Sequence, residues 1–598
     1  MAFKPSKVRS MFKLDSRATA SSSSNNDASS IATGEQVEIV TTPGPGPGPG
    51  PVPGPNPDTS TSHPGGEQHT GLKEQITTRQ FIFMALGGSI GAGLFIASSK
   101  GLQQGGPGSL FFAFAAVGLA VWLTMCALGE LSASFPVQGS FYDFSVRFIS
   151  PSWGFAMGWN YNINFMLIVP FEITVIILIE RFWGTGVPKV ALVPVFILGL
   201  AAVHLFGART YAEVERALGI AKILVLMTFV VTGIVIAAGG TREAGGRGFE
   251  NWRHGQAFIH GGPGFISVFV AAGMAYGGTE MLGLTVAECK EPRRVMPLAS
   301  TLVIGRLIIC YLLPLFVVGL VLKPSAFQEP EFAHLHAVSP FVAGVAKARI
   351  KVLPHVINGF LIAAVFSMAS SAFFASSRSL TAICRQGMGP RIFAKTTKSG
   401  LPRNSLIAVL VVAQLAWVTG APDGDYVFEW LLALASTSNF FTWLSICVCH
   451  IRVRRAISRQ GRTTNNLVWR SPTGVWGSYI AAFIITTCLI SLIVSASLPP
   501  VIPTSVEHSE IVLMNILGFI VVFVCWTGHL LIQARKDHNK SWRERILIPL
   551  DQLDLSALDA NHSPVGPGAE TRENLSALHT NQSSGLSEAE SKEKAEQV

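Results

Sequence analysis

The most restrictive feature of the sequence is a series of long apolar segments between residues 80 and 533. Two of them, at 110–128 and 223–240, contain no charged residue and are about as long as the ~20 residues that a helix needs to cross a bilayer. Hydrophobic residues make up 49% of the 598-residue chain and charged residues only 14%. A water-soluble protein of this size would need more charge on its surface. The sequence therefore predicts an all-α membrane protein.

We predict about twelve transmembrane helices within a membrane domain at 79–533. Their approximate ranges are 80–99, 108–134, 152–180, 188–207, 212–239, 262–287, 299–322, 352–383, 404–420, 426–450, 474–497 and 511–533. The N-terminal tail, 1–78, is rich in serine and in Pro-Gly repeats, and the C-terminal tail, 534–598, is polar. Neither composition can bury a core, so we expect both tails to be disordered.

The distribution of basic residues predicts the orientation in the membrane. An even number of spans places both termini on one side, and the loops after spans 6, 8 and 10 on that side are basic, whereas those after spans 9 and 11 contain no lysine or arginine. The loops after spans 5 and 7 are exceptions. The balance predicts cytosolic termini. It also explains the net charge of +9 without nucleic acid as a partner.

The sequence offers little support for a metal site or for an enzyme. Its eight cysteines lie mostly inside or beside apolar segments. The cluster Cys447-x-Cys449-His450 comes nearest to a ligand group, but at a helix end its side chains would not converge. We find no nucleophile–base arrangement and no cofactor motif, and we therefore expect neither catalysis nor a cofactor.

Charged residues inside apolar segments need a reason, because each costs about 2.5–3.5 kcal/mol at the bilayer centre. Five such residues are Glu130, Glu172, Lys222, Glu280 and Arg378. Others lie near predicted helix ends, where we expect them at the membrane interface: Glu180, Arg181, Glu213, Glu215 and Arg216.

Lys222 lies more than two helical turns inside span 5 and allows two interpretations. Its side chain either reaches along the helix to a lipid headgroup or faces the protein interior. A lysine in the interior would change its protonation with conformation, and could couple a proton gradient to transport.

Two spans contain clustered glycines. Span 1 begins with MALGGSIGAGLF at 84–95, and span 6 contains AAGMAYGGTEMLG at 271–283. Glycines let a helix unwind in mid-membrane, where free backbone groups can bind a carboxylate and an ammonium group. They also allow helices to pack closely. A matched pair of interruptions five spans apart favours binding, because an internal repeat of five helices would produce that spacing.

Several motifs resemble the fungal amino acid permeases of the amino acid–polyamine–cation superfamily. They are GGSIGAGLF (87–95), ALGELSASFPVQGSF (127–141), YAEVERALGIAK (211–222), GGTEMLGLTVAECKEPRRVMPLA (277–299) and SSRSLTAICRQGMGPRIF (376–393). The resemblance covers nearly all of 79–533 and neither tail. It implies a five-plus-five inverted repeat with two extra C-terminal helices, which works by alternating access.

The resemblance also implies roles for individual residues. The substrate's carboxylate and amino groups would be held in span 1 by Ser89, Ile90, Gly91, Ala92 and Gly93. Span 6 would complete the amine site and supply an aromatic gate through Met274, Ala275, Tyr276 and Gly277. Lys222 matches a lysine of proton-coupled relatives that replaces a sodium ion between spans 1 and 8, with Ser376 and Ser377 as the span 8 partners. Glu130 and Glu280 match acids used structurally or in proton coupling.

The sequence departs from the family pattern at two positions. Ala92 stands where fungal members usually have threonine, which removes a hydroxyl contact. Gly277 stands where many relatives have glutamine, and we expect a larger pocket there. These differences weaken any inference of the substrate from relatives.

We predict a proton-coupled amino acid importer of the plasma membrane. The alternative is a permease-like sensor that binds amino acids and signals through its tails without net transport. The sequence leaves open which amino acid is carried, and whether the substrate is a polyamine, γ-aminobutyrate or choline. Beyond substrate, protons and lipid, the tails could meet trafficking or ubiquitination machinery, for instance at Lys4, Lys7 and Lys13.

Overall fold

A computed structural model of the chain describes residues 76–135, 137, 139–241, 248–253, 255–289, 292–329, 339–420, 424–498, 508–536 and 541–560. Every regular element in these residues is a helix, and one isolated β-bridge joins Ile76 to Cys289. The predicted all-α class is confirmed. Residues 1–75, most of the predicted N-terminal tail, lie outside the described part of the chain.

Ten helices of the described residues are long and apolar enough to cross a membrane, whereas the sequence predicts about twelve. The difference has two causes. Predicted spans 1 and 2 share the continuous stretch Gly93–Ser134, and predicted span 4 is a helix of 17 residues, Lys189–Leu205. The first two spans are separated by a kink at Gly106, whose φ of 82° only glycine adopts readily, followed by Pro107.

The helices of the first half are α1 (Thr78–Gly87), η2 (Gly93–Ala97), α2 (Ser98–Ser134), α3 (Ser140–Phe148), α4 (Pro151–Glu180), α5 (Lys189–Leu205) and α6 (Ala208–Ala237). Span 6 consists of α7 (Gly261–Tyr276), α8 (Met281–Thr285) and η6 (Val286–Glu288). Span 7 consists of α9 (Pro292–Arg306), the π-helix η7 (Leu307–Leu312) and α10 (Leu313–Val321). After span 7, the membrane domain contains the helices α12 (Pro340–Lys347), α13 (Leu353–Arg385), α14 (Arg403–Ala413), η10 (Gln414–Gly420), α15 (Gly424–Arg459), α16 (Gly474–Ser497) and α17 (His508–Lys536).

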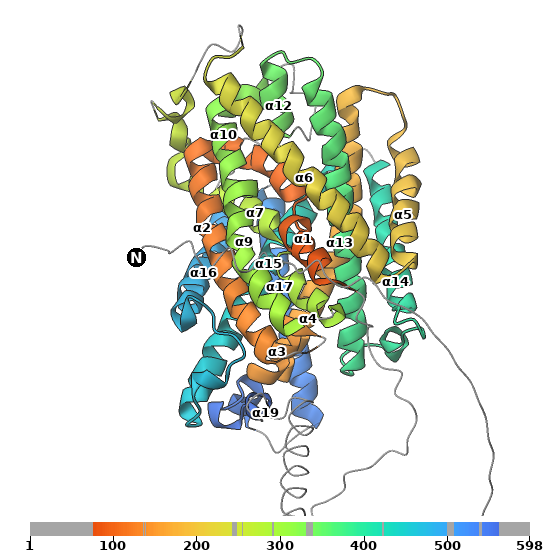
Figure 1. Cartoon of the computed structure of the whole chain (residues 1–598), viewed down its shortest axis with the longest axis vertical. Helices are drawn as coiled ribbons and strands as arrows, with labels where there is room; N and C mark the ends of the chain where they lie inside the picture. Colours follow the sequence, from red (N-terminus) through yellow and green to blue (C-terminus); the bar gives the residue numbers. More distant parts are fainter. Residues whose placement is uncertain are drawn as a thin grey trace, which may run out of the picture. The chain divides into compact units, whose positions relative to one another are not determined.

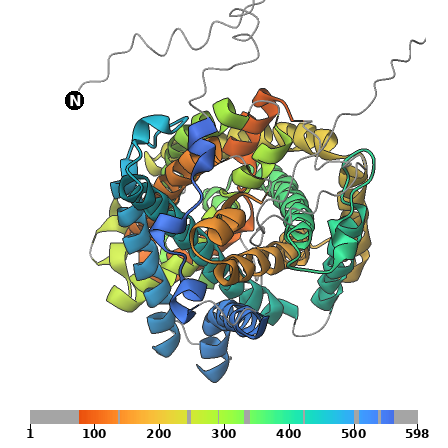
Figure 2. The same ribbon diagram turned by 90° about the horizontal axis from the view of Figure 1, so that it is seen from below.

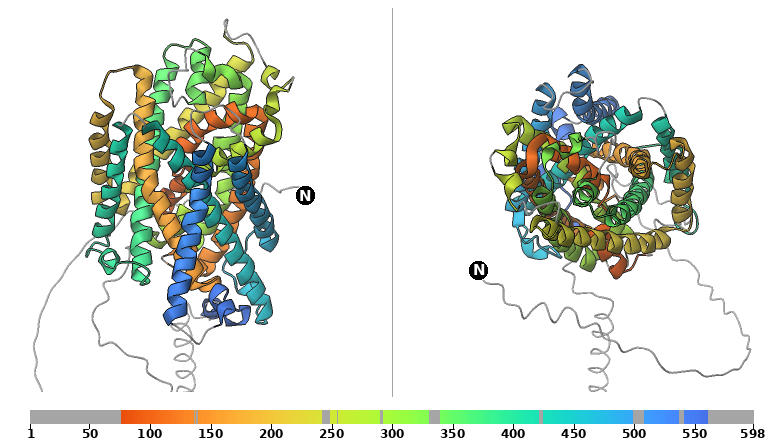
Figure 3. Two further views of the ribbon diagram at one scale, coloured as in Figure 1. Left: turned by 180° about the vertical axis from the view of Figure 1, so that it is seen from behind. Right: turned by 90° about the horizontal axis from the view of Figure 1, so that it is seen from above.

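The interrupted spans lie inside the helical bundle. The short helix α1 packs against α6 and α9, and α7 packs along α2 (Figure 1). On the other side of the breaks, α4 and α13 run side by side, as two views along the bundle show (Figures 2 and 3). The helices α16 and α17 pack against each other at the rim, where apolar side chains such as Phe483 and Phe523 are exposed. An exposed apolar surface of this kind suits contact with lipid.

The prediction of a disordered C-terminal tail from residue 534 is wrong for 541–560. This segment forms α18 (Trp542–Ile546), η12 (Leu550–Gln552) and α19 (Ser556–Ala560). The Ile548 N–H donates to the Ile149 carbonyl at 2.9 Å, and Gln460 donates to the Leu550 and Leu553 carbonyls. Three of its leucines are at most 3% exposed: Leu553, Leu555 and Leu558. The predicted tail beyond residue 560 lies outside the described residues.

We expect a chain that ends after Lys540 to be less stable than one that ends after Ala560. The shorter chain loses those three buried leucines, and burial of each contributes about 1.5–3 kcal/mol. The apparent melting temperature of the purified protein in detergent should fall by about 5 °C or more for the shorter chain. The chain that ends after Ala560 keeps these leucines, and equal melting of both truncations would contradict the packing described here.

Candidate functional site

The break in span 1 lies between α1 and η2. Helix α1 ends when the Gly88 N–H donates to the Met84 carbonyl at 2.8 Å, and no helix covers Ser89, Ile90 and Gly91. Interrupting the helix leaves carbonyl groups without their usual partners. Side chains from other spans supply those partners: Lys222 donates to the Gly87 carbonyl at 2.9 Å, and Arg306 donates to the Ala85 carbonyl at 3.1 Å.

The break in span 6 separates α7 from α8. Gly277 leaves the helical conformation, and Gly278 has a φ of 87°, which favours glycine. Glu280, just after the break, accepts the Gly278 N–H at 3.2 Å and the Trp443 indole N–H at 2.8 Å. The predicted glycine interruptions are therefore real gaps in both helices.

The two broken spans touch through backbone. A methyl group added at Gly93 would lie only 2.4 Å from the Cα of Ala275. The nine residues predicted to bind substrate are all buried around this contact: Ser89, Ile90, Gly91, Ala92, Gly93, Met274, Ala275, Tyr276 and Gly277. Close packing and binding, the two interpretations of the glycines, are thus compatible, because these glycines bring two broken helices together.

Tyr276, the predicted aromatic gate, joins α7 to α2. Its hydroxyl donates to the Phe114 carbonyl at 3.0 Å, and its ring lies 4.6 Å from that of Tyr311, centroid to centroid. The expected enlargement of the pocket at Gly277 does not occur. The side chain of Asn439 on α15 fills that space, with its amide nitrogen 2.1 Å from where a Cβ of Gly277 would be.

Lys222 faces the interior, which excludes the lipid-headgroup interpretation. Its ammonium group lies 3.5 Å from the Glu215 carboxylate, and both side chains are 1% exposed. Glu215 also accepts a hydrogen bond from Ser367 on α13 at 2.6 Å. The expectation that Glu215 lies at the membrane interface is therefore wrong, because its carboxylate faces the protein interior, between Lys222 and Ser367.

Ser376 and Ser377 do not lie beside Lys222. Their hydroxyls donate to carbonyls of their own helix, at Ala372 and Phe374. Ser367, about two and a half turns earlier on α13, takes the predicted place. The error arises because α13 has 33 residues, and the sequence does not indicate which turn of so long a helix crosses span 1.

Sequence reasoning gave no role to Glu172, which lies at the break. Glu172 on α4 is fully buried, and its Oε1 would lie 3.1 Å from a Cβ at Gly91. Neither carboxylate oxygen has a side-chain hydrogen-bond partner among the described residues. Its charge within an apolar segment was the available signal.

Arg306 was missed altogether. It is 2% exposed and donates to Ser89, to Thr279 at 3.0 Å and to Tyr311 at 3.3 Å, so it contacts both breaks. It ends α9 where the π-helix begins, and such widened turns are frequent at functional sites. Among the described residues it forms no ion pair with a carboxylate. In the sequence, a charged residue seven positions after the start of predicted span 7 is the feature that could have identified Arg306.

Glu130 lies apart from the breaks. Near the end of α2 it accepts hydrogen bonds from His450 at 2.9 Å, from Arg454 at 2.6 Å and from the Ser471 N–H at 2.7 Å. These contacts join α2 to α15 and to the loop that precedes α16. Of the two predicted acids, Glu280 is thus at the break and Glu130 is in a separate polar cluster.

The space at the breaks is small in this conformation. A cavity of about 10 Å³, with room for roughly one water molecule, is lined by Gly88, Gly278, Thr279, Arg306 and neighbouring residues. A larger ligand therefore requires the two broken spans to move apart.

Comparison with known proteins identifies the family. Residues 80–541 match the amino acid permease family. The chain belongs to this family. It is 39% identical to a general amino-acid permease of Candida albicans over 70% of this chain and 71% of that protein. A general amino-acid permease of Saccharomyces cerevisiae is 33% identical over 81% and 80% of the two chains. A cationic amino acid transporter of Schizosaccharomyces pombe is 37% identical over 71% and 73%.

Membership of this family makes the protein an integral, multi-pass membrane protein that transports amino acids. The resemblance to fungal amino acid permeases, drawn from the motifs, is confirmed.

The substitution Gly93→Ala should abolish amino acid uptake. Its methyl group cannot fit against the Ala275 backbone, so the two breaks could not approach each other. Gly305→Ala is the matched control, because no atom lies within 4 Å of a Cβ there. Alanine should even favour the helix there by up to about 1 kcal/mol. Uptake and the amount of folded protein should be measured for both variants, and normal uptake by Gly93→Ala would refute the contact.

Proposed function

We propose that the protein imports amino acids across the plasma membrane together with protons, by alternating access. The observation that carries this proposal is the pair of facing breaks with buried charged side chains beside them. Broken helices in mid-membrane present amide and carbonyl groups to a ligand with both an anionic and a cationic end. A zwitterionic α-amino acid is such a ligand.

The charges favour a particular orientation of the substrate. The start of η2, at Gly93, presents the positive end of a helix, which suits the α-carboxylate. Glu172, whose carboxylate has no side-chain hydrogen-bond partner among the described residues, suits the α-ammonium group. Closure of Tyr276 against α2 would then separate the bound substrate from one side of the membrane.

The sum of the buried charges supports proton coupling. Near the breaks lie the carboxylates of Glu172, Glu215 and Glu280 and the cations Lys222 and Arg306, all at most 3% exposed. Fully ionised, these groups carry one net negative charge. One added proton makes the centre neutral, and a zwitterion leaves it neutral. An uncompensated charge in mid-membrane is costly, so the cycle favours moving substrate and proton together.

Lys222 is the residue that would link this proton to movement. It ties α6 to the end of α1 through the Gly87 carbonyl and to α13 through Glu215 and Ser367. Protonation of Glu215 would remove the charge that holds the Lys222 ammonium group in place, so Lys222 would be free to leave the Gly87 carbonyl and release α1. Glu280, bound by Trp443, would serve to hold the break in span 6.

The relatives support a substrate that is an α-amino acid without choosing its side chain. Two of those named above are general permeases and one is described as a cationic transporter, at similar identity. The basic loops support cytosolic termini. Uptake of radiolabelled amino acids in a permease-deficient host, with a competition panel and a protonophore, tests the proposal. Signalling without uptake would instead favour a sensor.

Lys222→Ala should abolish accumulation against a gradient, because the variant loses the group that ties α6 to the break. The measurement is the steady-state ratio of internal to external labelled amino acid, with and without a protonophore. Lys351→Ala, which removes an exposed lysine, should accumulate substrate like the wild type. Full protonophore-sensitive accumulation by Lys222→Ala would refute its role.

Glu172→Gln should raise the KM for uptake by about tenfold or more, because it removes a charged acceptor but keeps the shape of the side chain. Glu180→Gln makes the same change at the partly exposed end of α4 and should leave the KM unchanged. Initial uptake rates over a range of substrate concentrations would distinguish them. An unaltered KM for Glu172→Gln would remove Glu172 from the amine site.

A further inference from the structure

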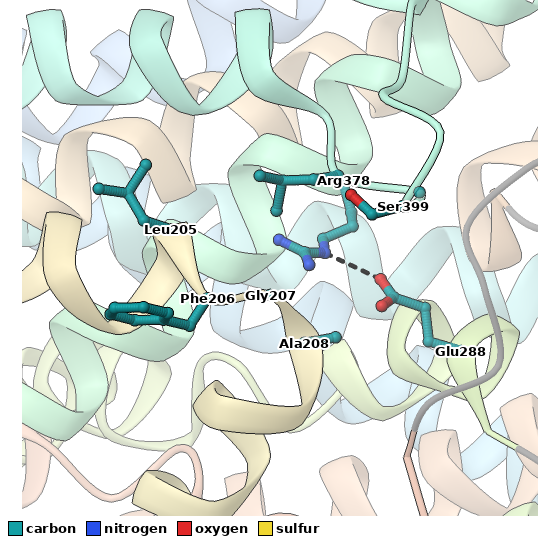
Figure 4. A pocket seen from close by; sticks show the side chains of 9 residues that line it. Leu205, Phe206, Gly207, Ala208, Glu288, Arg378 and Ser399 are labelled. Atoms are coloured by element: carbon teal, nitrogen blue, oxygen red, sulfur yellow. Dashed lines mark hydrogen bonds and ion pairs between the residues drawn. The ribbon is translucent and has the colours of Figure 1, made fainter.

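A second cavity lies away from the breaks. It has a volume of about 90 Å³ and is lined by Leu205, Phe206, Gly207, Ala208, Glu288, Arg378, Ser399, Gly400 and Leu401 (Figure 4). Its walls come from the α5–α6 turn, the end of span 6, the last third of α13 and the loop after α13. The loops after spans 6 and 8 are among the basic loops assigned above to the cytosol.

A buried ion pair forms one wall of this cavity. The Nε of Arg378 donates to Oε1 of Glu288 at 2.8 Å, and both side chains are 4% exposed. The guanidinium also lies 3.7 Å above the ring of Phe374, and its Nη1 donates to Ser377 at 3.2 Å. These contacts hold both charged groups in fixed positions.

Each partner keeps one polar atom unused. Among the described residues, Nη2 of Arg378 and Oε2 of Glu288 have no hydrogen-bond partner, yet neither atom is sealed from solvent. Figure 4 shows the guanidinium and the carboxylate side by side, between Gly207 and Ser399. A donor and an acceptor of opposite charge therefore border the same small space.

The opposite wall adds further donors. The 30-residue helix α6 begins at Ala208, and its N-cap is Gly207, with a φ of 93°. Because glycine has no side chain, the cap residue does not accept a hydrogen bond from the first N–H groups of the helix. The first N–H groups of a helix have no partner within it and attract anions. Gly207 and Ala208 both line the cavity.

We propose that this cavity is a second binding site for a zwitterionic α-amino acid, occupied on the cytosolic side after the substrate leaves the breaks. The α-carboxylate binds Nη2 of Arg378 and the N-terminus of α6, and the α-ammonium group binds Oε2 of Glu288. Leu205, Phe206 and Leu401 surround the substrate side chain. The inference rests on the proposed transport function and adds a site to it.

The size of the cavity fits a small amino acid. At about 10–15 Å³ for each water-sized group, 90 Å³ holds roughly six or more such groups. Alanine has about this number of non-hydrogen atoms. Larger side chains would extend past Ser399, which is exposed.

The site is also connected to both broken spans. Glu288 ends η6, which continues α8, and its backbone carbonyl accepts the Ile76 N–H just before α1 at 2.9 Å. The Arg378–Glu288 pair thus ties the second half of span 6 to α13. An amino acid that engages both charges weakens this tie, and its binding favours the open state of this side.

The test uses the full-length protein in right-side-out and inside-out membrane vesicles, with radiolabelled L-alanine as the probe. Ser399→Trp narrows the cavity and leaves the ion pair intact. The double variant Arg378→Gln/Glu288→Gln removes both charges, so that no unpaired charge is left buried. Lys398→Trp is the matched control, because the neighbouring exposed residue does not line the cavity.

Both cavity variants should raise the half-saturation concentration at the face with the basic loops by about tenfold or more. The half-saturation concentration at the opposite face should not change, and Lys398→Trp should resemble the wild type at both faces. If Ser399→Trp does not change the half-saturation concentration at the face with the basic loops, the second site is overturned, whereas the proposed transport function is not. If the wild type carries neither alanine nor any other amino acid of a full panel, the proposed function and the second site both fail.

Discussion

The structure depends on one requirement of the bilayer: every backbone group inside it needs a hydrogen-bond partner. Two helices are broken here, and their carbonyl groups find partners on neighbouring helices. Lys222 donates to Gly87, Arg306 donates to Ala85, and the Tyr311 hydroxyl donates to Ala275 at 3.0 Å. The breaks are therefore held by side chains of spans 5 and 7, and a change at those residues alters the geometry of both breaks.

This arrangement explains why charged residues are retained at such depth. A lysine and an arginine that bind backbone carbonyls replace the hydrogen bonds that a continuous helix would make. The same groups carry charge, so the side chains that stabilise the broken backbone are also those on which the proposed binding of a proton and a zwitterion would act. Structural support of the breaks and the proposed coupling would thus rest on the same side chains.

Much of the fold could be predicted because apolar length and glycine spacing are local properties of the sequence. The breaks near Gly91 and Gly277 follow from such patterns, whereas the sequence leaves the direction of Lys222 open between two interpretations, and only the structure places it in the interior. The contacts of the buried charged residues cannot be predicted in this way, because they join residues far apart in the chain. Glu172 contacts Gly91, and Glu215 contacts Ser367. The sequence also does not indicate which turn of α13 crosses span 1, because this depends on the relative shift of two long helices along their axes. For this reason Ser376 and Ser377 were wrongly predicted as partners of Lys222. The order of residues 541–560 was missed because a few buried leucines in a polar segment leave little signal.

The bridge between Ile76 and Cys289 has a consequence for the N-terminal tail. The Ile76 N–H and the Glu288 carbonyl join the start of the membrane domain to the end of span 6. If span 6 changes position during transport, the point at which the tail leaves the domain changes with it. A protein that recognises the chain close to this junction would therefore contact a different surface in each state. Its affinity would depend on the fraction of transporters in each state.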